Sequence, residues 1–143
     1  MFRADALLAN VLKHRKEANK TSTQSQLAHF KFRVLSLLEY FLQKHPSSSL
    51  VIIAVHGLFK AFVKSVHQLG TAPEESELLV KRLENILDSK VVKAKAYPRG
   101  QDVDLAAARV LLSKTWELVS SSSIQRIRTL GQVSFISVIL MLY

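Results

Sequence analysis

Glycine and proline are rare in this chain, and their scarcity limits the fold more than any other feature. Only 4 glycines and 3 prolines occur in 143 residues. A β-sandwich or barrel needs frequent tight turns, most of which are built from these two residue types. Apolar residues make up 48% of the chain, which argues against disorder and indicates helices buried on more than one side. The sequence therefore predicts an all-α fold.

Apolar residues recur at helical spacing in six stretches. The polar stretch 19–25, Pro46, Gly70 and the serine-rich joint 120–123 separate several of them. Serines 47–49, a capping box over 71–74 and Asp102 are expected to cap three of the helices. The six helices are expected over residues 2–17, 26–44, 50–69, 72–87, 103–119 and 124–143.

The second expected helix carries two adjacent apolar stripes, and this width suits a helix held between neighbours. One stripe consists of Phe30, Val34, Leu37 and Phe41, and the other of Leu35, Leu38 and Leu42. In the later helices the residues expected to face inward are Leu58, Phe59, Phe62, Val63, Val66, Leu79, Leu83, Ile86, Leu87, Val103, Ala107, Val110, Leu111 and Leu118.

Short joints between these helices predict antiparallel helical hairpins. Successive hairpins with wide apolar faces are typical of a HEAT/armadillo-like α-solenoid segment. We therefore expect residues 1–143 to form a single helical-repeat segment of a larger protein. The repeats share no sequence motif, so a compact helical bundle is the alternative.

The residues that could carry chemistry are few. The chain has no cysteine, which excludes disulfides, thiolate zinc sites and cysteine nucleophiles. No histidine lies three or four residues from another, and no glycine-rich phosphate loop occurs. Asp102 and Asp104 have the spacing of an acidic metal-binding pair, but helix capping explains both. Trp116 is expected to be a core residue or a contact between solenoid helices, and not a stacking platform. We predict no catalytic residue, cofactor or metal, and no enzyme activity.

The charge of the chain points to a polyanionic partner. The formal net charge is +9 and the pI is near 10.0. Two basic clusters are the candidate nucleic-acid-binding residues, since flexible cations at a helical edge can contact phosphates without reading bases. A solvated lysine-rich surface is the alternative. The first cluster is Lys13, Arg15, Lys16 and Lys20, and the second, around Tyr97, is Lys90, Lys93, Lys95 and Arg99.

Neither end of the chain has the pattern of a membrane segment. The opening residues lack the apolar run of a signal peptide, because basic residues from Lys13 to Lys16 interrupt early. The apolar run 133–143 is about half as long as a bilayer requires. We expect this run to be a helix that packs on another protein surface, and no membrane or small-molecule partner.

Five stretches together resemble the Myb-binding protein 1A / DNA polymerase V (polymerase phi) family, in particular its plant-type members. The similar stretches are 1–9, 24–27, 30–39, 93–95 and 98–103. The most specific is Phe30-Lys31-Phe32-Arg33-Val34-Leu35-Ser36-Leu37-Leu38-Glu39. The resemblance covers most of the chain in order, and none of its motifs is catalytic.

This resemblance implies a helical-repeat protein of the nucleus and nucleolus. It implies roles in ribosomal RNA gene transcription, ribosome biogenesis and transcriptional co-regulation, with DNA or nuclear proteins as partners. It also implies a fragment, because the acidic tract and the basic tail of the family are not in this chain. Two other functions stay open: a DNA-directed DNA polymerase-type nucleotidyl transferase, as the family name suggests, and a general protein-binding adaptor.

Overall fold

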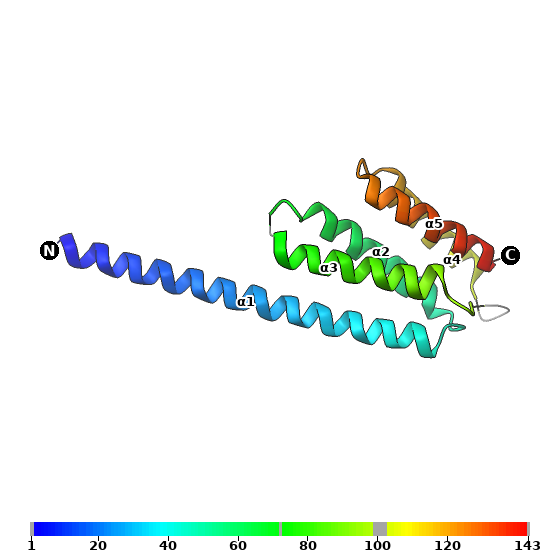
Figure 1. The fold of residues 1–143 in the computed structure, drawn as a ribbon, viewed down its shortest axis with the longest axis horizontal. Coiled ribbons are helices and arrows are strands. Elements are labelled where there is room, and N and C mark those ends of the chain that lie inside the picture. The colour runs from blue at the N-terminus through cyan, green and yellow to red at the C-terminus, as the bar shows by residue number, and fades with distance from the viewer. Residues whose placement is uncertain (1, 72, 99–102, 143) are drawn as a thin grey trace. The chain divides into compact units, whose positions relative to one another are not determined.

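The computed structural model describes residues 2–71, 73–98 and 103–142, and these residues form helices joined by short connections (Figure 1). No strand occurs among them, so the predicted all-α class is confirmed. The helices are α1 (Phe2–Lys44), α2 (Leu50–His67), α3 (Pro73–Ile86), the π-helix η1 (Leu87–Val92), α4 (Leu105–Ser120) and α5 (Gln125–Leu142).

The chain divides into two compact units, which are described separately. Unit 1 covers Met1–Val34 and therefore consists of the N-terminal part of α1. Unit 2 covers Leu35–Tyr143 and holds the end of α1 and all the other helices.

Helix α1 is continuous through the stretch 19–25, where the polar composition predicts a loop. That prediction is wrong, and so is the separation of helices over 2–17 and 26–44. Two threonines show how the polar stretch stays helical: Thr21 Oγ1 donates to the carbonyl of Glu17 at 2.9 Å, and Thr23 Oγ1 to that of Asn19 at 2.8 Å. No glycine or proline precedes Pro46, so nothing in the backbone breaks the helix.

Unit 1 buries no side chain among its described residues. Between residues 4 and 34 every side chain is exposed or only partly buried. This holds for large apolar residues too: Leu7 is 66% exposed and Phe30 is 63% exposed. A single amphipathic helix has no surface of its own to bury such residues against.

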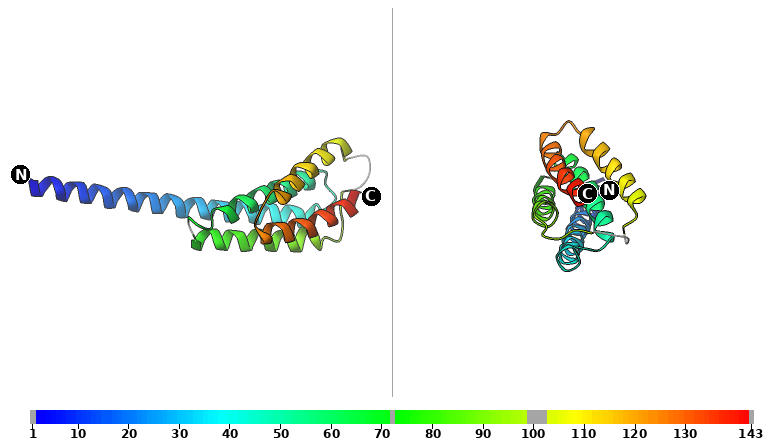
Figure 2. Two further views of the ribbon diagram at one scale, coloured as in Figure 1. Left: turned by 90° about the horizontal axis from the view of Figure 1, so that it is seen from above. Right: turned by 90° about the vertical axis from the view of Figure 1, so that its right-hand side faces the viewer.

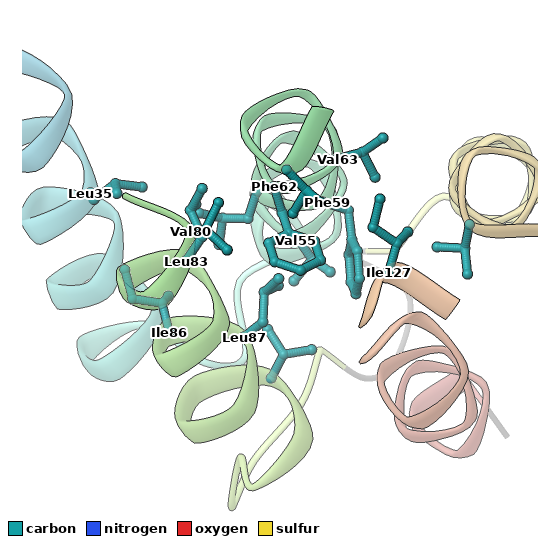
Figure 3. Packing of buried hydrophobic residues seen from close by; sticks show 14 of the residues in the cluster. Leu35, Val55, Phe59, Phe62, Val63, Val80, Leu83, Ile86, Leu87 and Ile127 are labelled. Atoms are coloured by element: carbon teal, nitrogen blue, oxygen red, sulfur yellow. The ribbon is translucent and has the colours of Figure 1, made fainter. Parts of the chain in front are cut away.

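Unit 2 is organised around α2. This helix packs against α3 on one side and α4 on the other, and it also contacts α5 (Figure 2). Its buried residues include the five predicted from helical spacing, which confirms that prediction. Phe59 and Phe62 lie in the middle of the core, where Val80, Leu83 and Leu87 meet them (Figure 3). Length and composition alone would let α2 cross a membrane, and they are equally those of a core helix.

At the end of α1, the two predicted apolar stripes contribute unequally to the core. Leu35 and Leu42 are buried, and Leu38 packs partly against the same cluster. In the other stripe Phe41 packs partly against the cluster, whereas Leu37 is 70% exposed. In this orientation of α1, Arg82 Nη2 of α3 also donates to Glu39 Oε2 at 2.5 Å.

Helix α4 is turned about one residue from the predicted register. Its buried residues are Ala108, Thr115 and Val119, whereas Val110, predicted to face inward, is 53% exposed. The N-cap is Asp104, whose Oδ1 accepts from the backbone N–H of Ala106 and Ala107 at 2.9 and 3.2 Å. Asp102, the predicted cap, lies outside the described residues.

The connection after α3 begins later than predicted. Residues Leu87–Val92 continue as the π-helix η1, so Lys90 is helical and not part of a free basic connection. Leu87 and Val91 are buried, and η1 packs against α5. Leu87 and Val91 are four residues apart and both enter the core from η1.

The remaining caps differ in detail from the predictions. Ser49 makes no side-chain cap on α2, but Ser48 Oγ accepts from the N–H of Leu50 at 3.3 Å. The predicted capping box over 71–74 includes Ala72, which lies outside the described residues. Thr71 Oγ1 instead donates to the carbonyl of Gln68 at 2.9 Å.

Candidate polyanion-binding surface

Three of the four cations in the first predicted cluster lie on one face of unit 1. Intervals of three and then four residues separate Lys13, Lys16 and Lys20, which places the three side chains within an arc of about 60° around the helix axis. Over this stripe, about 10 Å separates the first lysine from the last along the axis. Arg15 is exposed but points to the far side of the helix, roughly 100° or more from all three. We call Lys13, Lys16 and Lys20 the lysine stripe.

The lysine stripe is free to bind an anion. All three side chains are exposed, and in the described part of the chain no carboxylate lies within ion-pair distance of them. The nearest acid in sequence, Glu17, is oriented toward His14, with 3.9 Å between its Oε2 and Nδ1. The stripe therefore faces solvent beside one carboxylate, because Glu17 lines the same patch of surface without forming an ion pair with any of the three lysines.

The second predicted cluster is not brought together in the same way. Lys93 Nζ donates to Asp88 Oδ2 at 2.6 Å, so part of its charge is already paired. Lys90 is half-buried in η1, Lys95 is exposed, and Arg99 lies outside the described residues. This segment presents less free positive charge than its sequence indicates.

A third basic group was not predicted, because only the tertiary structure forms it. Lys60 of α2 and Lys114 of α4 both lie near His56. Burial is the main cause that lowers the pKa of the His56 imidazole, and the two positive charges lower it further. The two lysines are far apart in sequence, and no local pattern could have found them. We call His56, Lys60 and Lys114 the α2–α4 basic group.

The half-buried His56 has a defined hydrogen-bond partner. Its Nδ1 lies 2.8 Å from Thr115 Oγ1, and the Thr115 hydroxyl donates to the carbonyl of Leu111, also at 2.8 Å. Since that hydroxyl proton is already used, the threonine oxygen accepts, and Nδ1 of the histidine carries a proton. The histidine is thus tied to the α2–α4 interface through Nδ1, and the lone pair of its neutral ring lies on Nε2.

A small cavity lies beside this pair, between α2, α4 and α5. Its volume is about 30 Å³, and its lining is almost entirely apolar. Trp116 lines it and is 42% exposed, so it is not a core residue, but its ring centroid lies 4.8 Å from that of Phe135 in α5. Ser134 Oγ also lines the cavity, fully buried and without a hydrogen-bond partner. This space is far smaller than a ligand pocket.

Among the described residues no three potential metal-ligating side chains come together. Asp104 caps α4, and the other member of the predicted acidic pair, Asp102, is outside the described residues. The geometry described above offers charge and surface for binding, and no assembled nucleophile, base and orienting acid.

Comparisons of this chain with protein-family models, with curated proteins and with solved structures gave no match. The resemblance noted from the sequence is therefore neither supported nor opposed by them.

Proposed function

We propose that this chain is a non-catalytic helical scaffold that binds polyanions through the lysine stripe of unit 1. The observation that carries the proposal is the stripe itself: Lys13, Lys16 and Lys20 share one exposed helix face and have no carboxylate partner in the described structure. Cations arranged in this way contact phosphates and neutralise them without reading base sequence.

The scaffold is proposed to be a HEAT/armadillo-like segment. Two features of unit 2 support an alternating array: α2 packs against α4, and the α3–η1 segment packs against α5. Each helix thus contacts the next but one, as stacked hairpins do. The ion pair between Glu39 and Arg82 likewise links the end of α1 to α3, which is the next helix but one.

The biological setting is proposed from the family resemblance. A nucleic-acid-binding scaffold fits a nuclear and nucleolar factor in ribosomal RNA gene transcription, ribosome biogenesis and transcriptional co-regulation. Its partners would then be DNA or RNA together with nuclear proteins. A nucleotidyl transferase has less support, because its clustered carboxylates are not seen in the described part of the chain.

A salt-dependent binding experiment tests the proposal. The purified chain is titrated against labelled ribosomal DNA, unrelated DNA and RNA at several salt concentrations. We expect binding without sequence preference that weakens steeply as salt rises. The triple variant Lys13→Glu/Lys16→Glu/Lys20→Glu should lose most of this binding and flatten the salt slope by about one unit per lysine.

A second triple variant provides the matched control. Lys60→Glu/Lys64→Glu/Lys114→Glu changes the net charge equally on exposed positions of unit 2. It should reduce the affinity much less than the first triple variant does. Equal loss from both variants would show that overall charge drives binding. Loss from the second variant alone would move the site to the α2–α4 basic group.

A further inference from the structure

Unit 1 also carries an exposed apolar line that the polyanion site does not use. Leu27, Phe30 and Val34 are 52%, 63% and 37% exposed. Their three-then-four spacing places them within an arc of about 60° on the helix. This is the spacing by which one α-helix packs along another. We call these three residues the helix seam.

The charges around the helix seam have one sign. Lys31 and Arg33 flank it on opposite sides, and both are exposed. Between Glu17 and Glu39 the sequence has no acidic residue at all. A partner that covers the seam must therefore place its own edges next to positive charge, which favours Asp and Glu at those edges.

A second copy of this chain fits the helix seam poorly. Intervals of three and four residues alternate from the lysine stripe through Thr23 to the helix seam. The stripe and the seam therefore lie along one face of the helix. In a parallel pair, the lysine stripes of the two copies would face each other. In an antiparallel pair, the lysines of one copy would lie against the apolar residues of the other. Both arrangements place unpaired charge inside the contact.

We propose that the helix seam binds an amphipathic α-helix of a different protein with acidic edges. Apolar residues of that helix pack on Leu27, Phe30 and Val34, and its carboxylates pair with Lys31 and Arg33. Phe30 is the anchor, because it is the largest and most exposed of the three side chains. This site lies beyond the proposed polyanion site and uses other residues.

Three synthetic peptides of 21 residues test the proposal with the full chain. The first has Leu and Ile at helix-packing positions and Glu at the flanking positions. The second has Lys in place of each Glu, and the third has the composition of the first in scrambled order. Fluorescence anisotropy should show binding of the first peptide only. Equal binding of the scrambled acidic peptide would overturn the proposal, because attraction between charges alone would then explain it.

Variants of the chain locate the contact. Phe30→Ala and Phe30→Asp should each weaken binding of the first peptide at least tenfold. His29→Asp is the control, since it adds the same charge one residue away on a different, exposed face. It should leave binding within about twofold of the original chain. Circular dichroism of each variant verifies that the helix content is unchanged, and unaltered binding by Phe30→Ala would contradict the proposal.

Two further readouts separate this site from other outcomes. Sedimentation of the chain alone should show a monomer; a dimer that Phe30→Asp dissociates would make a second copy the occupant and would overturn the proposal. DNA binding should survive Phe30→Ala and be lost in the lysine-stripe variant, which should still bind the acidic peptide. Failure of one site is thereby distinguishable from failure of the other.

Discussion

Gly131 of α5 lies directly against Val119 of α4. A Cβ atom added at Gly131 would overlap both methyl groups of Val119, which is itself only 3% exposed. The two helices can approach this closely because glycine has no side chain at the crossing. The contact also lies at the edge of the small cavity between α2, α4 and α5.

Gly131→Ala should destabilise the chain by about 1–3 kcal/mol, because the buried valine cannot move aside without disturbing the core. Thermal or urea unfolding followed by circular dichroism measures the change. Gly57→Ala is the matched control, since Gly57 is also helical but nothing lies within 4 Å of its added Cβ. It should stabilise the chain by roughly 0.5–1 kcal/mol through helix propensity. Equal effects of the two changes would refute a tight crossing at Gly131.

The two apolar stripes at the end of α1 should respond differently to a charge. Leu42→Asp should unfold unit 2 or cost several kcal/mol, because Leu42 is 3% exposed and its replacement would be an unpaired buried carboxylate. Leu37→Asp should cost about 1 kcal/mol or less, because Leu37 is 70% exposed. Urea midpoints of both variants check this, and a Leu42→Asp protein as stable as the original would show that α1 is rotated differently.

The ion pair between α3 and α5 should contribute modestly to stability. Arg126 donates to both carboxylate oxygens of Glu84, including Nη2 to Oε2 at 2.7 Å, and Glu77 lies 3.9 Å away. This pairing, chiefly the hydrogen bond to Glu84, raises the pKa of Arg126. Both side chains are partly exposed, so we expect a coupling free energy of about 0.5–1 kcal/mol.

A double-mutant cycle with Arg126→Gln and Glu84→Gln measures that coupling. It should shrink in 1 M salt, because the pair is open to solvent and therefore screened. A coupling that salt does not change would mean that packing of the long arginine side chain, and not its charge, holds the two helices.

Stability should fall in mildly acidic solution because of His56. Burial, and then the nearby Lys60 and Lys114, lower the pKa of His56 in the folded state. The unfolded chain consequently takes up a proton at higher pH than the folded chain does. The stability contributed by the neutral imidazole is complete above about pH 6.5, the unfolded pKa, and is lost as the pH falls toward the folded value.

Unfolding free energies between pH 5 and 8 test this linkage. His56→Gln removes the titrating group and should make the pH dependence shallower in this range. The other histidines are the internal control, because they remain in both proteins. Parallel pH profiles for the original chain and the variant would rule out His56 as the source.

Local patterns predicted the helices well and their orientation less well. Helical spacing and the lack of glycine and proline indicated most helical stretches, including the buried face of α2. The stretch 19–25 has the polar composition of a loop but contains no glycine or proline, so it does not interrupt α1. Threonine side chains that bond back to the helix carbonyls show that polarity without a breaker does not end a helix. Helical spacing in the sequence also predicts the lysine stripe, because it places Lys13, Lys16 and Lys20 on one face of a helix and Arg15 on another.

The sequence by itself determined that this chain is helical and basic, because both properties depend on which residues are present and how they follow one another. Tertiary structure alone decided which of the two apolar stripes at the end of α1 is more deeply buried in unit 2. The two stripes are similarly apolar, and packing against the core cluster, with the pair of Glu39 and Arg82 beside it, distinguishes them. Tertiary structure also brought Lys60 and Lys114 together around His56. Helical periodicity fixes the faces of one helix, but which face meets a neighbour depends on residues distant in the chain.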